Sequence, residues 1–230
     1  MEILTKLNII WESFPVLMEG TLVALELTFI FLGVGVAVGV PVALAQTYGN
    51  RVVRVLASIF EQIFRGLPAL VLLFLFYFGL TGINISPLVA ATLAMGLRSA
   101  AYQSQIFRGA IQSIEAGQDQ AARSIGMSRY KSIRYIVLPQ AVRLAIPPWS
   151  NEFTNMVKDT SYVFVVGIVE LMRQGRYIVA REFGDALLVY SVIALIYFFL
   201  NYAGNHLLGR LARKLAIPGE MAGDSAMERI

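Results

Sequence analysis

Two groups of polar side chains interrupt stretches of the sequence that are otherwise apolar, and the members of each group have helical spacing. The groups are Arg98, Tyr102 and Gln105 in one stretch, and Glu152, Asn155 and Asp159 in another. Residues at such spacings share one face of a helix. One face offers a cation and hydrogen-bond donors, and the other offers carboxylates. An amino acid zwitterion requires this pairing, because it carries a carboxylate and an ammonium group.

The same residues also support a purely structural interpretation. Arg98 could pair with Glu152 or Asp159 only to hold two helices together. For any single residue the two interpretations carry similar weight. Ionisable groups are costly inside a membrane span, and each is therefore a candidate for function. A polar cavity lined by some of these residues is the favoured prediction.

The composition indicates that helices within a bilayer must position these side chains. Hydrophobic residues make up 57% of the 230 residues and charged residues 15%, whereas soluble domains have roughly 45–50% and 25%. One soluble core of this size cannot hide such a surplus. This excludes disorder, a fibrous repeat and an ordinary soluble enzyme. The chain has no cysteine and a single histidine, His206, so a cysteine or histidine metal site is not expected.

Five segments are predicted to cross the membrane as helices, which requires about 30 Å of apolar length. The fold class is therefore all-α, a polytopic membrane protein with about five transmembrane helices. The predicted spans are 21–45, 52–80, 86–107, 136–157 and 186–208, and the apolar piece 160–171 is too short to span. Residues 1–217 are expected to form one transmembrane domain and 218–230 a short polar tail.

The distribution of lysine and arginine predicts the orientation of the chain. If the N-terminus is outside, the segments 48–54, 108–134 and 206–230 lie inside and hold eleven basic residues. The external segments then hold four, namely Lys6, Arg173, Arg176 and Arg181. Cytoplasmic loops carry the excess of basic residues. We therefore predict an external N-terminus, a cytoplasmic C-terminus and a cytoplasmic segment 108–134.

Two further features are predicted within the spans. Glu61 and Arg65 are four residues apart, in the order that favours an ion pair on a helix, and structural pairing is their favoured role. Segment 64–68, which ends in Pro68, is predicted to interrupt its helix and to line protein or a water-filled cavity. Gly35 and Gly39 would allow close helix approach, although the abundance of glycine in membrane helices explains them equally well.

The cytoplasmic segment 114–134 contains the most specific pattern of the sequence. Its acidic residues fall early, where they suit a helix N-terminus, and Gly126 is placed to end the helix. The result is a short amphipathic helix with a patch of small residues, which could dock into a groove of another protein or be a solvated connector. The residues proposed for docking are Gln120, Ala121, Ala122, Gly126 and Met127.

This segment resembles the coupling loop of ATP-binding-cassette importer permeases. The family pattern is Glu-Ala-Ala, three residues, Gly, nine residues and Ile-x-Leu-Pro. The matching residues here are Ala121, Ala122, Gly126, Ile136, Leu138 and Pro139, with Gln120 in place of the leading Glu. From about residue 20 to residue 215 the sequence looks like the polar amino acid subfamily. Further resemblances are Arg-Gly-Leu-Pro at 65–68, the segment 101–109 with Gln105 in place of Glu, Asn-Glu-Phe at 151–153 and Lys-Asp-Thr-Ser at 158–161.

The resemblance implies a type I importer permease in the plasma membrane of a prokaryote. Two permease subunits, identical or related, would form one pathway. Two cytoplasmic ATPase subunits would bind the coupling helices. An extracellular or periplasmic solute-binding protein would deliver an amino acid, and no nucleic acid is involved. The chain has no phosphate-binding loop of its own. It is therefore not expected to be an enzyme or to need a cofactor, because the partner would bind ATP.

Two other function classes compete with the importer. A self-contained ion- or proton-coupled carrier or channel would use Arg98, Glu152 and Asp159 as a relay and need no ATPase. An intramembrane enzyme lacks support, since the usual protease and hydrolase motifs are absent. The importer is strongly favoured. Because Gln105 replaces an acid, a slight preference for neutral or acidic polar amino acids over cationic ones is expected.

Overall fold

The computed structural model describes residues 2–79, 82, 85–114, 116–181 and 186–215, and these form helices joined by short connections. Within the described residues there is no strand, in agreement with the predicted all-α class. The helices are α1 (Glu2–Tyr48), α2 (Arg51–Gly66), α3 (Ala69–Gly79), α4 (Pro87–Gln112), α5 (Ala116–Ser124), α6 (Arg129–Ser132), α7 (Leu138–Asp159), α8 (Leu171–Arg181) and α9 (Ala186–Leu215). A π-helical turn, Ile133–Val137, precedes α7, and a 3-10 helix, Thr160–Val166, follows it.

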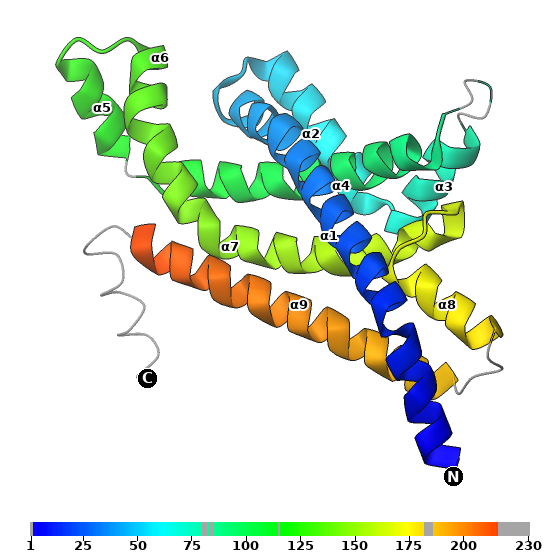
Figure 1. The fold of residues 1–230 in the computed structure, drawn as a ribbon. Coiled ribbons are helices and arrows are strands. Elements are labelled where there is room, and N and C mark those ends of the chain that lie inside the picture. Colours follow the sequence, from blue (N-terminus) through cyan, green and yellow to red (C-terminus); the bar gives the residue numbers. More distant parts are fainter. Residues whose placement is uncertain (1, 80–81, 83–84, 115, 182–185, 216–230) are drawn as a thin grey trace, which may run out of the picture.

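The first helix is longer than its apolar part. α1 has 47 residues, or about 70 Å at 1.5 Å per residue, so it extends beyond the hydrocarbon layer. The predicted span 21–45 captures only its apolar portion, because the preceding polar residues continue the same helix even though Pro15 lies within it. α1 crosses α4 obliquely and packs against it more extensively than against any other described helix (Figure 1).

Glycines allow this close crossing of α1 and α4. A Cβ added at Gly39 would lie 2.7 Å from the carbonyl oxygen of Ala100, and one at Gly35 would overlap the amide of Gln103. A Cβ at Gly33, by contrast, would meet nothing within 4 Å. The small-residue pattern at Gly35 and Gly39 thus marks a close helix–helix contact.

The helix break predicted around Pro68 is present. α2 ends at Gly66 and Leu67 is extended, with φ −90° and ψ 139°, as expected for a residue before proline. α3 then leaves at 103° to α2. The Glu61–Arg65 ion pair predicted on α2 is also present, with 2.8 Å between nitrogen and oxygen.

The helices long and apolar enough to cross a membrane are α1 and α9, together with the bent pair α2–α3 if it counts as one span. α4 and α7 have 26 and 22 residues, so they are long enough to span as well. They are more polar because they carry the residues of the candidate site. α7 is continuous despite Pro147 and Pro148.

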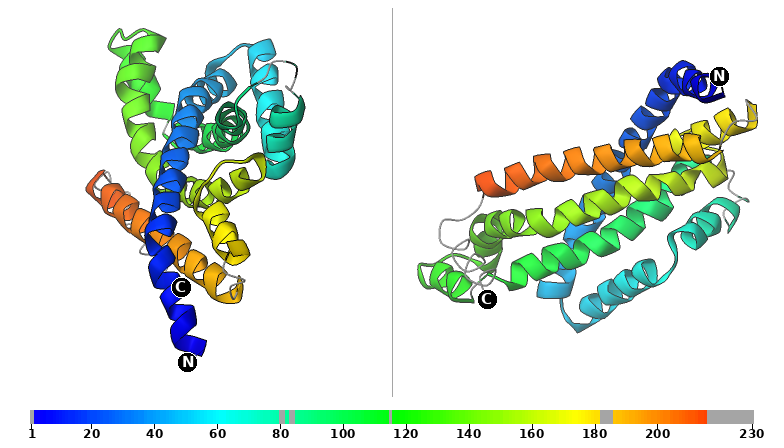
Figure 2. Two further views of the ribbon diagram at one scale, coloured as in Figure 1. Left: turned by 45° about the vertical axis from the view of Figure 1, so that its right-hand side comes forward. Right: turned by 90° about the horizontal axis from the view of Figure 1, so that it is seen from below.

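Different helices lie at the two ends of the molecule, as Figures 1 and 2 show. α5, α6 and the C-terminal end of α9 lie at one end, whereas the start of α1, α3 and α8 lie toward the other. α7 packs between α4 and α9. The largest apolar core joins α1, α3, α4, α7 and the 3-10 helix, and includes Phe31, Leu73, Met95, Met156 and Val163. This core fixes α4 and α7 side by side, so that their polar faces meet.

Candidate functional site

A polar hollow of about 300 Å³ lies between α4 and α7. It is partly open to the outside of the chain. The residues lining it are Arg98, Tyr102, Glu152, Asn155, Lys158, Asp159 and Tyr162. Five of the six residues proposed from the sequence as a substrate pathway therefore lie together here. The exception among the six is Gln105.

The hollow contains an ion pair that joins α4 to α7. A terminal nitrogen of Arg98 donates to a carboxylate oxygen of Asp159 at 2.5 Å, and both side chains are largely buried, at 18% and 13% exposed. The Nε of Arg98 is buried and has no partner among the described residues. Of the partners considered for Arg98 from the sequence, the structure pairs it with Asp159. The residues are 61 positions apart in the chain.

Tyr102 connects this hollow to a second polar cluster. The guanidinium of Arg98 lies 4.9 Å from the centre of the Tyr102 ring, and that of Arg65 lies 5.2 Å from the same ring. Each cation is attracted by the electron-rich ring, and each has its own carboxylate partner, Asp159 or Glu61. The ring therefore lies next to two charged pairs on different helices.

The second carboxylate of the hollow, Glu152, is held by a buried hydrogen-bond network. Ser99 donates to Glu152 at 2.7 Å. Ser99 accepts from the amide of Gln103, which also donates to the carbonyl oxygen of Leu32 in α1. The indole of Trp149 donates to the amide oxygen of Gln103 at 2.9 Å. This network supports one side of the hollow and ties α1, α4 and α7 together.

Gln105 belongs to the second cluster. Its amide donates to the buried carboxylate of Glu61, which also accepts from Gln46 at 2.8 Å and from Arg65 at 2.8 Å. One carboxylate, that of Glu61 on α2, therefore lies next to Gln105 in this chain. The slight preference for neutral or acidic polar amino acids that was inferred from Gln105 stays a prediction.

Sequence reasoning did not propose Lys158 or Tyr162 for the site. Lys158 follows Asn155 by three residues, and Tyr162 follows Asp159 by three. Both therefore continue the face that the spacing rule had already identified, and that rule could have found them. Glu61 was predicted only as a structural partner of Arg65. Its contacts with Gln46 and Gln105 depend on how three helices pack.

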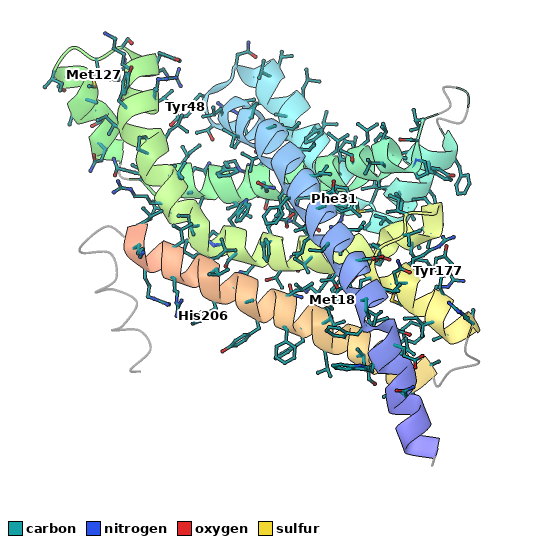
Figure 3. The ribbon with its side chains drawn as sticks, in the orientation of Figure 1. Met18, Phe31, Tyr48, Met127, Tyr177 and His206 are labelled. Atoms are coloured by element: carbon teal, nitrogen blue, oxygen red, sulfur yellow. The ribbon has the colours of Figure 1, made fainter. Side chains whose placement is uncertain are left out.

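Residues 116–134 form a unit at one end of the molecule, where Figure 3 labels Met127. α5 ends at Ser124, and the turn that ends it contains the predicted Gly126, whose φ is +88°. The amide of Gly126 donates to the carbonyl of Arg123, and that of Met127 donates to Ala122. This is the pattern of a Schellman helix end. Gln120 and Ala121 are exposed on α5, whereas Ala122 is 5% exposed and packs within the chain.

One contact holds this unit together, and two others connect it to α1 and α7. Ser132 donates to Asp119 at 2.5 Å, so that α6 is linked to α5. The guanidinium of Arg129 lies 5.3 Å from the centre of the Tyr48 ring at the end of α1. Gln140 at the start of α7 donates to Gln118 at 3.4 Å. A displacement of α5 would therefore be passed to both α1 and α7.

Comparison with known proteins supplies the context for this geometry. The family model described as "Binding-protein-dependent transport system inner membrane component" matches residues 35–217. The chain is 35% identical over 212 residues to the glutamine transport system permease protein GlnP of Escherichia coli (strain K12), covering 90% of this chain and 96% of that protein. It is 37% identical to the nopaline transport system permease protein NocM of Agrobacterium fabrum, covering 88% of each.

Solved structures resemble the chain as well. A chain from the crystal structure of an amino acid ABC transporter with histidines has a TM-score of 0.83 and 33% identity, covering 91% of this chain and 98% of that one. A chain from an inward-facing structure of the MetNI methionine ABC transporter has a TM-score of 0.77, covering 87% of this chain and 96% of that one. With 20% identity it supports the fold alone.

Proposed function

Because this chain belongs to the binding-protein-dependent transport system inner membrane component family, we propose that it is the permease subunit of an ATP-binding-cassette importer for polar amino acids. Relatives at 35% identity or more over most of the chain include permeases for glutamine and nopaline. The self-contained carrier weighed from the sequence is not favoured by these relatives. The chain itself would move a solute and carry out no covalent chemistry.

The observation that carries the substrate class is the hollow between α4 and α7. It combines cations, Arg98 and Lys158, with carboxylates, Glu152 and Asp159, around about 300 Å³ of space. A free amino acid carries one charge of each sign, so the lining offers a counter-charge for both of its ends. Buried charged groups in membrane proteins mark substrate pathways, and a broken helix such as α2–α3 is common beside them.

ATP hydrolysis by the partner subunits would drive transport through the segment 114–134, which we call the coupling region. We assign α5 and the residues up to Met127 to contact with a cytoplasmic ATPase dimer, since Gln120 and Ala121 are exposed there. Closure of the ATPases would displace α5, and the contacts Arg129–Tyr48 and Gln140–Gln118 would pass the motion to α1 and α7. The helices would then alternate between inward and outward openings as rigid bodies.

The assembly proposed around this chain has further parts. A second permease subunit, either a second copy or a related chain, would complete the pathway. A solute-binding protein would dock on the external side, where the basic pattern places α8 and the start of α1. The expected location is the inner membrane of a prokaryote.

The test is the ATPase activity of the assembly reconstituted in liposomes with its ATPase and binding protein, measured against a panel of amino acids. We expect stimulation by one class of amino acid, and only when the binding protein is present. Stimulation would support the importer and identify its substrate in one experiment.

An intact assembly that no amino acid stimulates would overturn the proposed substrate class. Uptake that persists in vesicles without ATP would favour the self-contained carrier instead. The purified permease without its ATPase partner is the control, and no ATP hydrolysis is expected from it.

A further inference from the structure

One cation in the hollow has no counter-charge paired with it. Lys158 lies on α7 one turn from Asn155 and one turn from Tyr162, and all three side chains line the hollow and are exposed. None of the sequence reasoning or the relatives' names assigns it a role. Its position was decided by the packing of α4 against α7, which leaves this face of α7 uncovered by the chain.

The two cations of the hollow differ in how they are held. Arg98 is already bound to Asp159 at 2.5 Å and stacked on Tyr102. Across the described part of the chain, no hydrogen bond and no ion pair engages the ammonium group of Lys158. Asp159, the next residue along the chain, acts on it only through space.

Lys158 directly follows the predicted span 136–157, where an ammonium group is stabilised by water or by a counter-charge. Groups of this kind face water-filled cavities and pair with ligands or other charges. A lysine ammonium is a compact charge on a flexible stem with three donors, so it can follow a mobile anion. A guanidinium fixed by a carboxylate and a ring, such as that of Arg98, is less able to do so.

Lys158 also borders a second hollow of about 510 Å³ between α7, α8 and α9. That hollow is lined mostly by apolar side chains, including Met172, Ile193 and Phe198. It offers no carboxylate, whereas the first hollow offers Glu152 and Asp159 beside Lys158. A ligand with charges of both signs therefore fits the first hollow and not the second.

We propose that Lys158 is the residue that binds the α-carboxylate of the transported amino acid, while the carboxylates of Glu152 and Asp159 receive its ammonium group. Arg98 is then a positioning residue, which holds Asp159 in place through their ion pair. This inference rests on the proposed function and specifies which of its residues contacts which end of the substrate. It makes Lys158 the residue that distinguishes free amino acids from analogues whose carboxyl group is blocked.

The test is direct binding to the purified permease–ATPase complex without the binding protein, because the binding protein has a site of its own. The probes are the amino acid that most stimulates ATPase in the panel and the α-carboxamide of the same amino acid. The carboxamide keeps the ammonium group and loses the negative charge. We expect the wild type to prefer the free amino acid by about tenfold or more, which is the size of a charge-assisted hydrogen bond.

Three variants separate the roles. Lys158→Met should lower that preference to about twofold, and Lys158→Arg should retain most of it, because it keeps the charge. Lys214→Met removes the same charge from an exposed position of α9, and should bind both probes as the wild type does. Basal ATPase and elution as a single species report folding for each variant.

The proposal is overturned if Lys158→Met keeps the wild-type preference, or if the wild type binds neither probe. A preference lost in Arg98→Gln and kept in Lys158→Met would assign the carboxylate to Arg98. These outcomes are distinct from failure of the proposed function, which would appear as an assembly that no amino acid stimulates. Normal stimulation with an unchanged Lys158→Met would refute only the role of this lysine.

Discussion

Glu170 is a fully buried carboxylate in the connection before α8, between the predicted spans 136–157 and 186–208. It accepts hydrogen bonds from the backbone amides of Met172 and Arg173 at 2.8 and 2.9 Å, and from the hydroxyl of Tyr197 in α9 at 3.1 Å. It therefore caps α8 and ties it to α9. Burial raises the pKa of Glu170 from 4.5 to about 7, although these hydrogen bonds act in the opposite direction.

This carboxyl predicts a pH dependence of stability. The folded chain binds the proton of Glu170 more readily than the unfolded chain, so its contribution is full below about pH 4.5 and is lost as the pH rises through about 7. The loss amounts to about 3–4 kcal/mol at most, taking about 1.4 kcal/mol per pKa unit. The melting temperature of the purified protein should fall between pH 5 and pH 8.

The matched variants are Glu170→Gln and Glu12→Gln, the latter at an exposed position. Glu170→Gln should flatten the change in melting temperature with pH, whatever its stability at a single pH. Glu12→Gln should keep the wild-type slope. Equal slopes in all three proteins would show that Glu170 is not the group responsible.

At the residue scale, local spacing predicted what lies within one helix and missed what lies between helices. The Glu61–Arg65 pair was predicted because both residues are on α2, four positions apart. The contact of Gln105 with Glu61 joins residues 44 positions apart. No property of either residue alone identifies the other as its partner, because that depends on the angle at which α2 meets α4.

The crossing of α1 and α4 is the element-scale contact that glycines control. In Gly39→Ala the new methyl group would lie 2.7 Å from the Ala100 carbonyl oxygen, which is backbone and cannot rotate away. The two helices would have to separate, at a cost of about 1–3 kcal/mol. We expect a lower melting temperature for Gly39→Ala than for the wild type.

Gly33→Ala is the control in the same helix. A methyl group there meets nothing within 4 Å, and replacing a helical glycine by alanine is favourable by roughly 0.5–1 kcal/mol. Its melting temperature should match or exceed that of the wild type. If both variants behave alike, the close approach of α1 to α4 at Gly39 is refuted.

The end of α5 gives a second prediction at this scale. Gly126 has a φ of +88°, which costs other residues about 1–2 kcal/mol and β-branched ones more. Gly126→Val should therefore distort the Schellman end and uncouple the ATPase. Substrate-stimulated ATPase should fall several-fold while the permease still assembles.

Gly126→Asn is the matched control, because asparagine tolerates positive φ better than other residues with a side chain. It should keep most of the stimulation. Normal coupling in Gly126→Val would count against a role for this turn in docking.

The orientation predicted for the whole molecule is simple to test, because the chain has no cysteine of its own. Val52 is 67% exposed next to the connection between α1 and α2, and Ala180 is exposed on α8. If the N-terminus is external, Ala180→Cys should react with a membrane-impermeant thiol reagent on intact cells. Val52→Cys should react only after the cells are opened.

The unmodified chain, which has no thiol, should remain unlabelled in both conditions. The reverse pattern would invert the orientation deduced from the basic residues. It would also move the coupling region to the wrong side for a cytoplasmic ATPase.

The helical class, the break before Pro68, the turn at Gly126 that ends α5 and the family were all predictable from the sequence, because these depend on neighbouring residues or on ordered motifs. Two of the predicted spans, those in α4 and α7, are recognised as helices whose polar faces meet in the structure. In the described part of the chain, however, only α1, α9 and the bent pair α2–α3 are apolar enough to pass as spans by length and composition.

How the polar residues divide between two clusters follows from the packing of the helices. Arg98 pairs with Asp159, Gln105 donates a hydrogen bond to Glu61, and Lys158 remains exposed in the hollow. The physical reason is that helical spacing fixes the face on which a side chain lies, whereas the partner of that face is set by how the helices cross. That crossing depends on distant contacts such as Gly39 against Ala100.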